Sequence, residues 1–251
     1  MLLDGKNAVI YGGGGSIGGA VASAFAREGA TVHLAGRTQA TLDGVAETIR
    51  STGGRAETAV VDALDEAQVD AHADRVAGEF GTLDVTVNLI STGDVQGTPL
   101  AEMSFDDFNR PIHNVLRSTF LTWRAAARHM IRQRSGVILA FGGEGDPIPN
   151  YNIGGFQISL SAIESLRRQM ASELGQYGIR VVSLTTGGIM ETVPSDFEGF
   201  DQIAELVVAP TMLKRAADLA DVGNVAAFAA SDWAKSITGS AINISCGAIL
   251  D

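Results

Sequence analysis

The sequence predicts an α/β fold, a doubly wound sheet of seven parallel strands with helices on both faces. Short apolar and β-branched runs alternate along the chain with longer stretches that repeat apolar side chains at helical spacing. The 30 glycines among the 251 residues gather in tight clusters between these segments, as expected where backbone approaches another group closely. No linker, charge block or repeat interrupts this pattern, so we expect one domain over residues 1–251.

The strands are predicted from apolar runs bounded by glycine or polar residues. They cover residues 7–11, 31–35, 58–61, 83–90, 136–141, 180–184 and 241–244. Parallel strands need a crossover between them, and a helix that packs back onto the sheet is the usual one. Ligands of such sheets bind beyond the carboxyl ends of the strands. The loops after the first six strands should therefore border one crevice.

The helices are predicted from apolar residues that recur on one face, as at Ile17, Val21 and Phe25. They cover residues 17–28, 38–51, 66–80, 105–134, 155–174 and 222–230. Glycine follows several of these segments directly, as Gly29 and Gly81 do, and glycine is a common helix terminator.

The charge balance excludes several classes of partner. Asp and Glu total 29 and Lys and Arg total 18, which gives a net charge of −11. Phosphate polyanions are repelled by such a chain, so we expect neither nucleic acid nor an anionic membrane as partner. The lone Cys246 and four scattered histidines predict no disulfide framework and no metal site. No leader segment and no membrane-spanning apolar run is visible, so the expected location is the cytoplasm.

A glycine-rich loop lies between the first strand and the first helix. Residues 11–19 read Tyr-Gly-Gly-Gly-Gly-Ser-Ile-Gly-Gly. Glycines in this position allow a tight turn and bring backbone close to a pyrophosphate at the helix N-terminus. A merely flexible loop is the alternative, but the strand–loop–helix context favours a Rossmann-type dinucleotide site. Its expected contacts are Gly12, Gly14, Gly15, Ser16 and Ile17.

The end of the second strand distinguishes NAD from NADP. An NAD site uses an acid there to bind the ribose 2′-hydroxyl, but residues 34–38 read Leu-Ala-Gly-Arg-Thr. Arg37 and Thr38 can instead hold a 2′-phosphate through charge-assisted hydrogen bonds. A surface arginine at a helix start is the alternative reading of Arg37. The sequence favours NADP(H) over NAD(H) as the cofactor.

These residues resemble the short-chain dehydrogenase/reductase family, and the resemblance covers nearly the whole chain. Gly12, Ile17 and Gly18 match the family's opening T-G-x-x-x-G-I-G, and residues 83–85 match its Leu-Asp-Val. The resemblance implies the cofactor contacts that lie outside the glycine loop. These are Asp62 and Ala63 at the adenine, Leu89, Ile90 and Ser91 after the fourth strand, and Gly187, Gly188, Ile189 and Thr192 beside the nicotinamide.

The catalytic positions of that family are not matched. The resemblance implies a tyrosine as general acid/base and a lysine four residues later, and these positions read Phe156 and Leu160. The family's serine falls at Gly143 and its helical asparagine at Val115. A phenyl ring and an isobutyl group cannot donate a proton, and general acid–base catalysis contributes about 10²–10⁴-fold in rate. The usual mechanism is therefore not expected.

Other residues are candidate proton donors. Tyr151 stands in a segment that is similar to the enoyl-reductase branch of the family, although it is displaced from both tyrosine positions that the family uses. Glu144 and Asp146 follow the fifth strand at the expected crevice. A loop or interface tyrosine and solvated carboxylates are the alternatives.

The resemblance also implies a lid and an oligomer. Residues 192–213 are predicted to be irregular. They correspond to the family's substrate lid. Their apolar residues are candidates either for a substrate pocket or for the core of the lid, and they are Phe197, Phe200, Ile203 and Leu206. Helices 106–134 and 155–174 correspond to those that pair across the family's homodimer and homotetramer interface, with an ordinary core face as the alternative.

The sequence leaves two candidate functions of different classes. The first is an NADP(H)-dependent oxidoreductase with an atypical active site and an unknown small-molecule substrate. The second is a non-catalytic dinucleotide-binding sensor or scaffold subunit. The retained cofactor residues favour the first, and the simultaneous change at Val115, Gly143, Phe156 and Leu160 favours the second.

Overall fold

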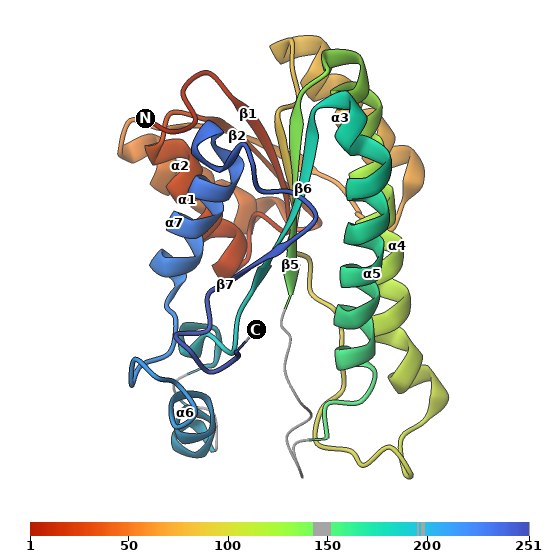
Figure 1. Cartoon of the computed structure of the whole chain (residues 1–251), viewed down its shortest axis with the longest axis vertical. Coiled ribbons are helices and arrows are strands. Elements are labelled where there is room, and N and C mark those ends of the chain that lie inside the picture. The colour runs from red at the N-terminus through yellow and green to blue at the C-terminus, as the bar shows by residue number, and fades with distance from the viewer. Residues whose placement is uncertain (143–151, 195, 197–198, 251) are drawn as a thin grey trace.

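A computed structural model of the chain describes residues 1–142, 152–194, 196 and 199–250. Its centre is a seven-stranded sheet in the order β3-β2-β1-β4-β5-β6-β7, in which every pair is parallel (Figure 1). The strands are β1 Asn7–Tyr11, β2 Thr31–Gly36, β3 Arg55–Val60, β4 Val85–Asn88, β5 Gly136–Gly142, β6 Ile179–Thr185 and β7 Ala241–Asn243. The predicted fold class is therefore confirmed.

Helices cover both faces of the sheet, as the doubly wound prediction requires. One layer contains α1 Ser16–Arg27, α2 Gln39–Ser51 and α7 Leu219–Ala230, and the other contains α3 Glu66–Phe80, α4 Phe105–Gln133 and α5 Phe156–Leu174 (Figure 1). Each layer encloses one hydrophobic cluster against the sheet. Within the described ranges, no helix is long and apolar enough to cross a membrane.

Helix starts follow capping chemistry that the sequence contains. The Asp65 carboxylate accepts hydrogen bonds from two backbone N–H groups in the first turn of α3, and the Ser104 hydroxyl accepts one from Asp107 in α4. At α7, Asp218 and Asp221 form a reciprocal capping box. By contrast, Gly15 begins α1 with no side-chain cap, which leaves backbone donors at that end for a ligand.

Several elements differ from the sequence prediction: β4 is shorter than predicted, α7 begins earlier, at Leu219, and two further segments differ for physical reasons. The chain over 192–213 was expected to be irregular, and this is wrong because α6, Phe200–Val208, forms within it. Figure 1 shows α6 beyond one end of the sheet, apart from both helix layers. Strand β3 begins at Arg55, whereas residue 58 was predicted. The strand lies at the edge of the sheet, and Ala56 is its one fully buried residue. Its apolar signal in the sequence is correspondingly weak.

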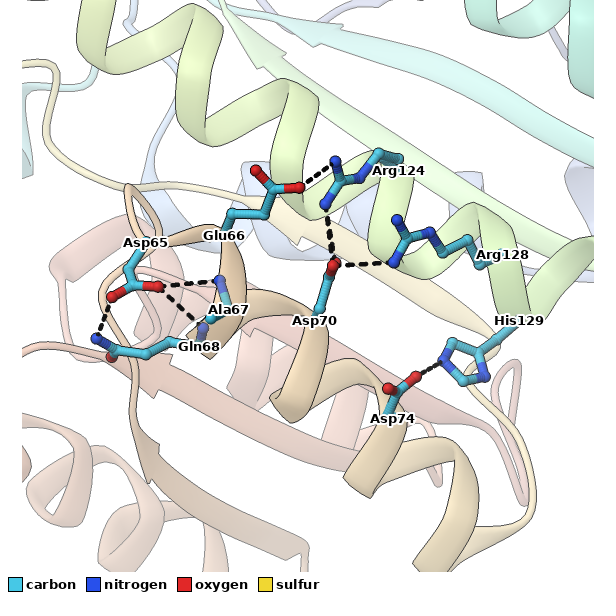
Figure 2. Close-up of polar contacts among 9 residues, drawn as sticks. All are labelled: Asp65, Glu66, Ala67, Gln68, Asp70, Asp74, Arg124, Arg128 and His129. Carbon is cyan, nitrogen blue, oxygen red and sulfur yellow. Dashed lines mark hydrogen bonds and ion pairs between the residues drawn. The ribbon is translucent and has the colours of Figure 1, made fainter.

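A row of ion pairs joins α3 to α4 (Figure 2). Arg124 contacts Glu66 at 2.7 Å and Asp70 at 3.0 Å, and Arg128 contacts the same Asp70 oxygen at 2.9 Å. Two arginines on one carboxylate form a network, and networks stabilise more than isolated surface pairs. This row fixes the first turns of α3 against the middle of α4.

Two histidines are buried beneath this helix layer. His33 of β2 and His72 of α3 are 1% and 4% exposed, and burial lowers the pKa of each to about 4. The His72 ring meets the buried Tyr11 ring edge-on at 5.7 Å. Among the described residues, neither ring nitrogen of His72 has a hydrogen-bond partner. Both rings are therefore neutral in the folded protein at pH 7.

These histidines predict acid sensitivity of the fold. In the unfolded chain a histidine has a pKa near 6.5 and so binds a proton between pH 6.5 and 4, whereas the folded protein excludes that proton. The free energy of unfolding should fall as pH drops through this window, by on the order of 3 kcal/mol for each histidine. His72→Leu should remove about half of the decrease, as measured by urea unfolding at pH 7, 5.5 and 4.5. Retention of the full decrease in His72→Leu, or its equal loss in the exposed control His113→Gln, would contradict this assignment.

Candidate functional site

A cavity of about 260 Å³ lies beyond the carboxyl ends of four neighbouring strands. The loops after β1, β2, β3 and β4 form its walls, together with one side chain of α4. It brings together ten of the residues that the sequence assigns to the cofactor, Gly12, Gly14, Gly15, Arg37, Thr38, Asp62, Ala63, Leu89, Ile90 and Ser91. This part of the predicted crevice is therefore present as one site.

Six lining residues were missed by sequence reasoning, and they are Gly36, Thr41, Leu42, Val61, Leu64 and Asn114. Gly36, Val61 and Leu64 are direct neighbours in sequence of predicted contacts, whereas Thr41 and Leu42 lie in the first turn of α2. Asn114 comes from α4, and only its position next to Val115 pointed toward it. Long-range placement of this kind carries no local sequence signal.

The close packing of the loop against β4 requires glycine at two of its positions. Gly12 has φ +81°, and a Cβ at this position would lie 2.3 Å from the carbonyl oxygen of Leu89. A Cβ on Gly18 would lie 2.2 Å from the carbonyl oxygen of Gly12. Real side chains do not tolerate such distances, so glycine is obligatory at both positions. The loop thereby presents Gly14 and Gly15 to the cavity at the open N-terminus of α1, where a phosphate is stabilised by backbone N–H groups.

The corner between β2 and α2 carries the cation of the site. Among the described residues that line the cavity, Arg37 is the one cation and Asp62 the one acid. Thr38 begins α2 without using its side chain as a cap, and the Thr41 hydroxyl donates to the Thr38 carbonyl at 2.9 Å. The exposed Arg37 guanidinium and the Thr38 hydroxyl thus border the cavity where a group on the ribose 2′-oxygen would be bound.

The loop after β3 holds Asp62 in a fixed geometry. Oδ1 of Asp62 accepts a hydrogen bond from the backbone N–H of Leu64 at 3.0 Å. The backbone N–H of Asp62 donates to Oε1 of Gln68 at 3.0 Å. The carboxylate is therefore oriented at the cavity wall before any ligand binds, as expected of a group that recognises a base edge.

Hydrogen bonds from two asparagine side chains connect α4 with the end of β4 and the loop that follows it. Asn88 donates to the Ser118 hydroxyl at 2.9 Å and accepts from the Ile90 backbone N–H at 3.3 Å. Asn114 donates to the carbonyl of Thr92 at 3.1 Å. Val115, at the family's asparagine position, is buried in the core. The amide next to it, on Asn114, thus supports the backbone of the loop that forms the cavity wall.

The first turns of α5 present an apolar face toward β5. Leu160 is 7% exposed, and a Cβ on Gly142 would lie 3.5 Å from one of its methyl groups. Phe156 packs partly buried on the same hydrophobic cluster. One helical turn further along this face, Glu164 pairs with Arg167 at 2.9 Å, and both of these charged side chains are buried. At positions 156 and 160, therefore, no group can transfer a proton.

Several predicted residues do not line this cavity. Ser16 and Ile17 open α1 behind the glycine loop. Gly187 packs near Ser245, and a Cβ on Gly188 would lie 3.0 Å from the methyl groups of Val207 in α6. Ile189 is buried, and the Thr192 hydroxyl donates to its carbonyl at 2.7 Å. Tyr151, Gly143, Glu144 and Asp146 lie outside the described residues.

A neighbouring acid has a structural partner. Glu191 accepts a hydrogen bond from the backbone N–H of Leu219 at 2.5 Å, at the start of α7. It thus connects the segment before α6 to the first turn of α7. In the ranges that the structure describes, no group of three or more His, Cys, Asp or Glu residues is arranged to hold a metal ion.

The chain is similar to known proteins over nearly its whole length. A family model described as "Enoyl-(Acyl carrier protein) reductase" matches residues 13–248. The 7alpha-hydroxysteroid dehydrogenase of Escherichia coli (strain K12) is 29% identical over 249 residues, which cover 99% of this chain and 96% of the relative.

Solved structures agree with these matches. A short-chain type dehydrogenase/reductase from Mycobacterium marinum is 31% identical with a TM-score of 0.89, covering 99% of this chain and 97% of the other. A 7 alpha-hydroxysteroid dehydrogenase complexed with NADH and 7-oxo glycochenodeoxycholic acid is 29% identical with a TM-score of 0.88, covering 99% and 96%. Sheet, glycine loop and similarity coincide over the same residues, and the chain therefore belongs to the short-chain dehydrogenase/reductase family of oxidoreductases.

Proposed function

We propose that this protein is an NADP(H)-binding oxidoreductase that transfers hydride to or from a small molecule and has an atypical active site. The observation that carries the proposal is the single cavity in which ten independently predicted cofactor residues meet. When bound, the dinucleotide supplies the hydride, and the protein supplies binding and orientation. The glycine loop takes the pyrophosphate, Asp62 the adenine and Arg37 the 2′-phosphate.

The preference for NADP(H) rests on the β2–α2 corner. The relative whose structure was solved with NADH shows that the family also takes the unphosphorylated cofactor. In this chain the corner reads Gly36-Arg37-Thr38, and it offers a guanidinium and a hydroxyl without a carboxylate. A guanidinium binds a phosphate through bidentate, charge-assisted hydrogen bonds, whereas a neutral ribose hydroxyl gains little from it.

The remaining sites complete the proposal. Gly187, Gly188, Ile189 and Thr192 pass the nicotinamide, and residues 192–213 with α6 form the substrate lid of a single domain. A proton comes from Tyr151, from a loop carboxylate or from water, or the substrate is one that needs none, such as an iminium.

A non-catalytic sensor or scaffold subunit is the second candidate function. It is favoured by the apolar side chains at both family positions on α5, Phe156 and Leu160, since a lysine at the latter would anchor the cofactor ribose. The decisive assay is NADPH oxidation with a panel of carbonyls, imines and enones. Turnover above a heat-inactivated control supports the oxidoreductase, whereas NADPH binding without any turnover supports the sensor.

The helix layer of α4 and α5 supports a homo-oligomer. A surface groove runs along α4, and its apolar residues are spaced by four, at Ile112, Leu116 and Phe120. Phe120 is 47% exposed, and Ile158 of the adjacent α5 is also 47% exposed. Large apolar side chains left in water at such spacing are typical of an interface. A homodimer or homotetramer through helices 106–134 and 155–174 would cover them.

Replacement of Arg37 tests the cofactor preference. Arg37→Gln should weaken NADPH binding about 10- to 100-fold, the loss expected for a charged hydrogen-bond donor, and leave NADH binding nearly unchanged. Isothermal titration calorimetry with both cofactors measures this. Arg27→Gln, at the far end of α1, is the matched control. Equal binding of NADPH by wild type and Arg37→Gln would overturn the assignment.

Restoring the family residues tests the atypical site. The double variant Phe156→Tyr/Leu160→Lys should gain carbonyl reduction by about 10²-fold, the lower end of the 10²–10⁴-fold range of acid–base catalysis. Leu160→Lys alone should lower the melting temperature, because it places a lysine in an apolar, buried position. A folded double variant that binds NADPH but reduces carbonyls no faster than wild type would show that more of the site has diverged.

A charge on the groove tests the oligomer. Phe120→Glu should shift the molar mass measured by light scattering toward the monomer, because assembly would bury an unpaired carboxylate. Leu100→Glu, an exposed loop residue outside the groove, is the control and should keep the wild-type mass. The interface lies elsewhere if Phe120→Glu keeps the wild-type mass as well.

A further inference from the structure

The loop over residues 62–65, after β3, forms the adenine end of the cavity. Asp62, Ala63 and Leu64 line the cavity directly, and Asp65 begins α3. Inside the loop, the Leu64 backbone N–H donates to Asp62 Oδ1 at 3.0 Å, and the Asp65 N–H donates to the Asp62 carbonyl at 2.9 Å. These bonds set the shape of the loop. Its placement relative to the cavity depends on contacts with the surrounding helices.

The first contact comes from the first turn of α3 (Figure 2). Asp65 Oδ1 accepts from the backbone N–H of Ala67 at 2.9 Å and from that of Gln68 at 3.1 Å. The Gln68 side chain donates back to Asp65 Oδ2 at 2.9 Å and accepts the backbone N–H of Asp62 at 3.0 Å. One glutamine thus holds both ends of the loop.

The second contact comes from α4, which is distant in sequence. Nε of Arg117 donates to the carbonyl oxygen of Leu64 at 2.8 Å. The arginine is exposed, so its hydrogen bond to the loop, rather than burial in the core, is what it contributes. Farther along α4, Arg124 forms ion pairs with Glu66 and Asp70 of α3, and these pairs hold the two helices together (Figure 2). The loop is consequently bracketed between two helices that are fixed to each other.

We propose that Arg117 and Gln68 are positioning residues for recognition of the adenine. They hold residues 62–65 so that the Asp62 carboxylate meets the amino group of the base, and neither needs to touch the cofactor. The inference rests on the proposed function, because it assumes a dinucleotide in the cavity. It extends that function by assigning adenine recognition to a helix, α4, that contributes only Asn114 to the cavity wall.

The test compares NADPH with its hypoxanthine analogue, which lacks the amino group of adenine. Wild type should bind NADPH several-fold more tightly than reduced nicotinamide hypoxanthine dinucleotide phosphate. Arg117→Met should weaken NADPH binding about three- to tenfold and the analogue less, so that the preference shrinks. Gln68→Met should act in the same direction, and Arg117→Lys, which keeps a donor, should restore part of the preference. Dissociation constants from fluorescence titration give each ratio.

The control is Arg128→Met, which removes a cation of the same helix that pairs with Asp70 and not with the loop. It should keep the wild-type preference. The positioning role is overturned if Arg117→Met keeps that preference, or if Arg128→Met reduces it equally, since either result would leave only a general effect of charge or stability. Failure of wild type to bind NADPH at all would instead refute the proposed function.

Discussion

The close approach of the first turn to the end of β4 is the constraint on which the site depends. β1 pairs with β4 in register, and the chain leaves β1 at Gly12 directly beside the carbonyl of Leu89. No side chain fits between them. Helix α1 therefore starts close to the carboxyl end of β1, and its uncapped backbone donors face the cavity. The same contact brings Leu89 and Ile90 to the opposite wall. One steric requirement thus sets the positions of both the glycine loop and the facing wall of the cavity.

Charged and neutral groups are separated between the two surfaces of the α3–α4 layer. Its outer surface is joined by the ion pairs of Arg124 and Arg128, whereas its inner surface contains two neutral, buried histidines. Charged groups in this layer stay at the solvent, and burial keeps the inner histidines uncharged, as the cost of desolvation requires. At neutral pH the layer is therefore charged at its outer surface and uncharged in its interior.

Sequence reasoning succeeded where the structure follows local rules. Helix α3 was predicted with its exact ends: Gly81 was the stop signal, and the structure shows that Asp65 caps the start. It failed at α6, although Phe200, Ile203 and Val207 stand at helical spacing, because Pro194, Gly199 and Pro210 around this nine-residue helix favoured an irregular segment. Contacts between distant segments, such as Arg117 with Leu64 or Asn114 with Thr92, depend on how α4 crosses the sheet. No spacing along the chain encodes such contacts.

The apolar positions on α5 are best understood together with the core behind them. Leu160 contacts the end of β5 and belongs to the same hydrophobic cluster as Phe156, so each fills space that the other also borders. A lysine at 160 without a hydroxyl at 156 would be a buried charge without a partner, which is costly, and an apolar pair removes that cost. Packing alone therefore favours apolar residues at both positions together rather than at one of them. The cavity after β1 to β4 is lined by neither Phe156 nor Leu160, so the proposed cofactor site does not depend on a catalytic pair at these two positions.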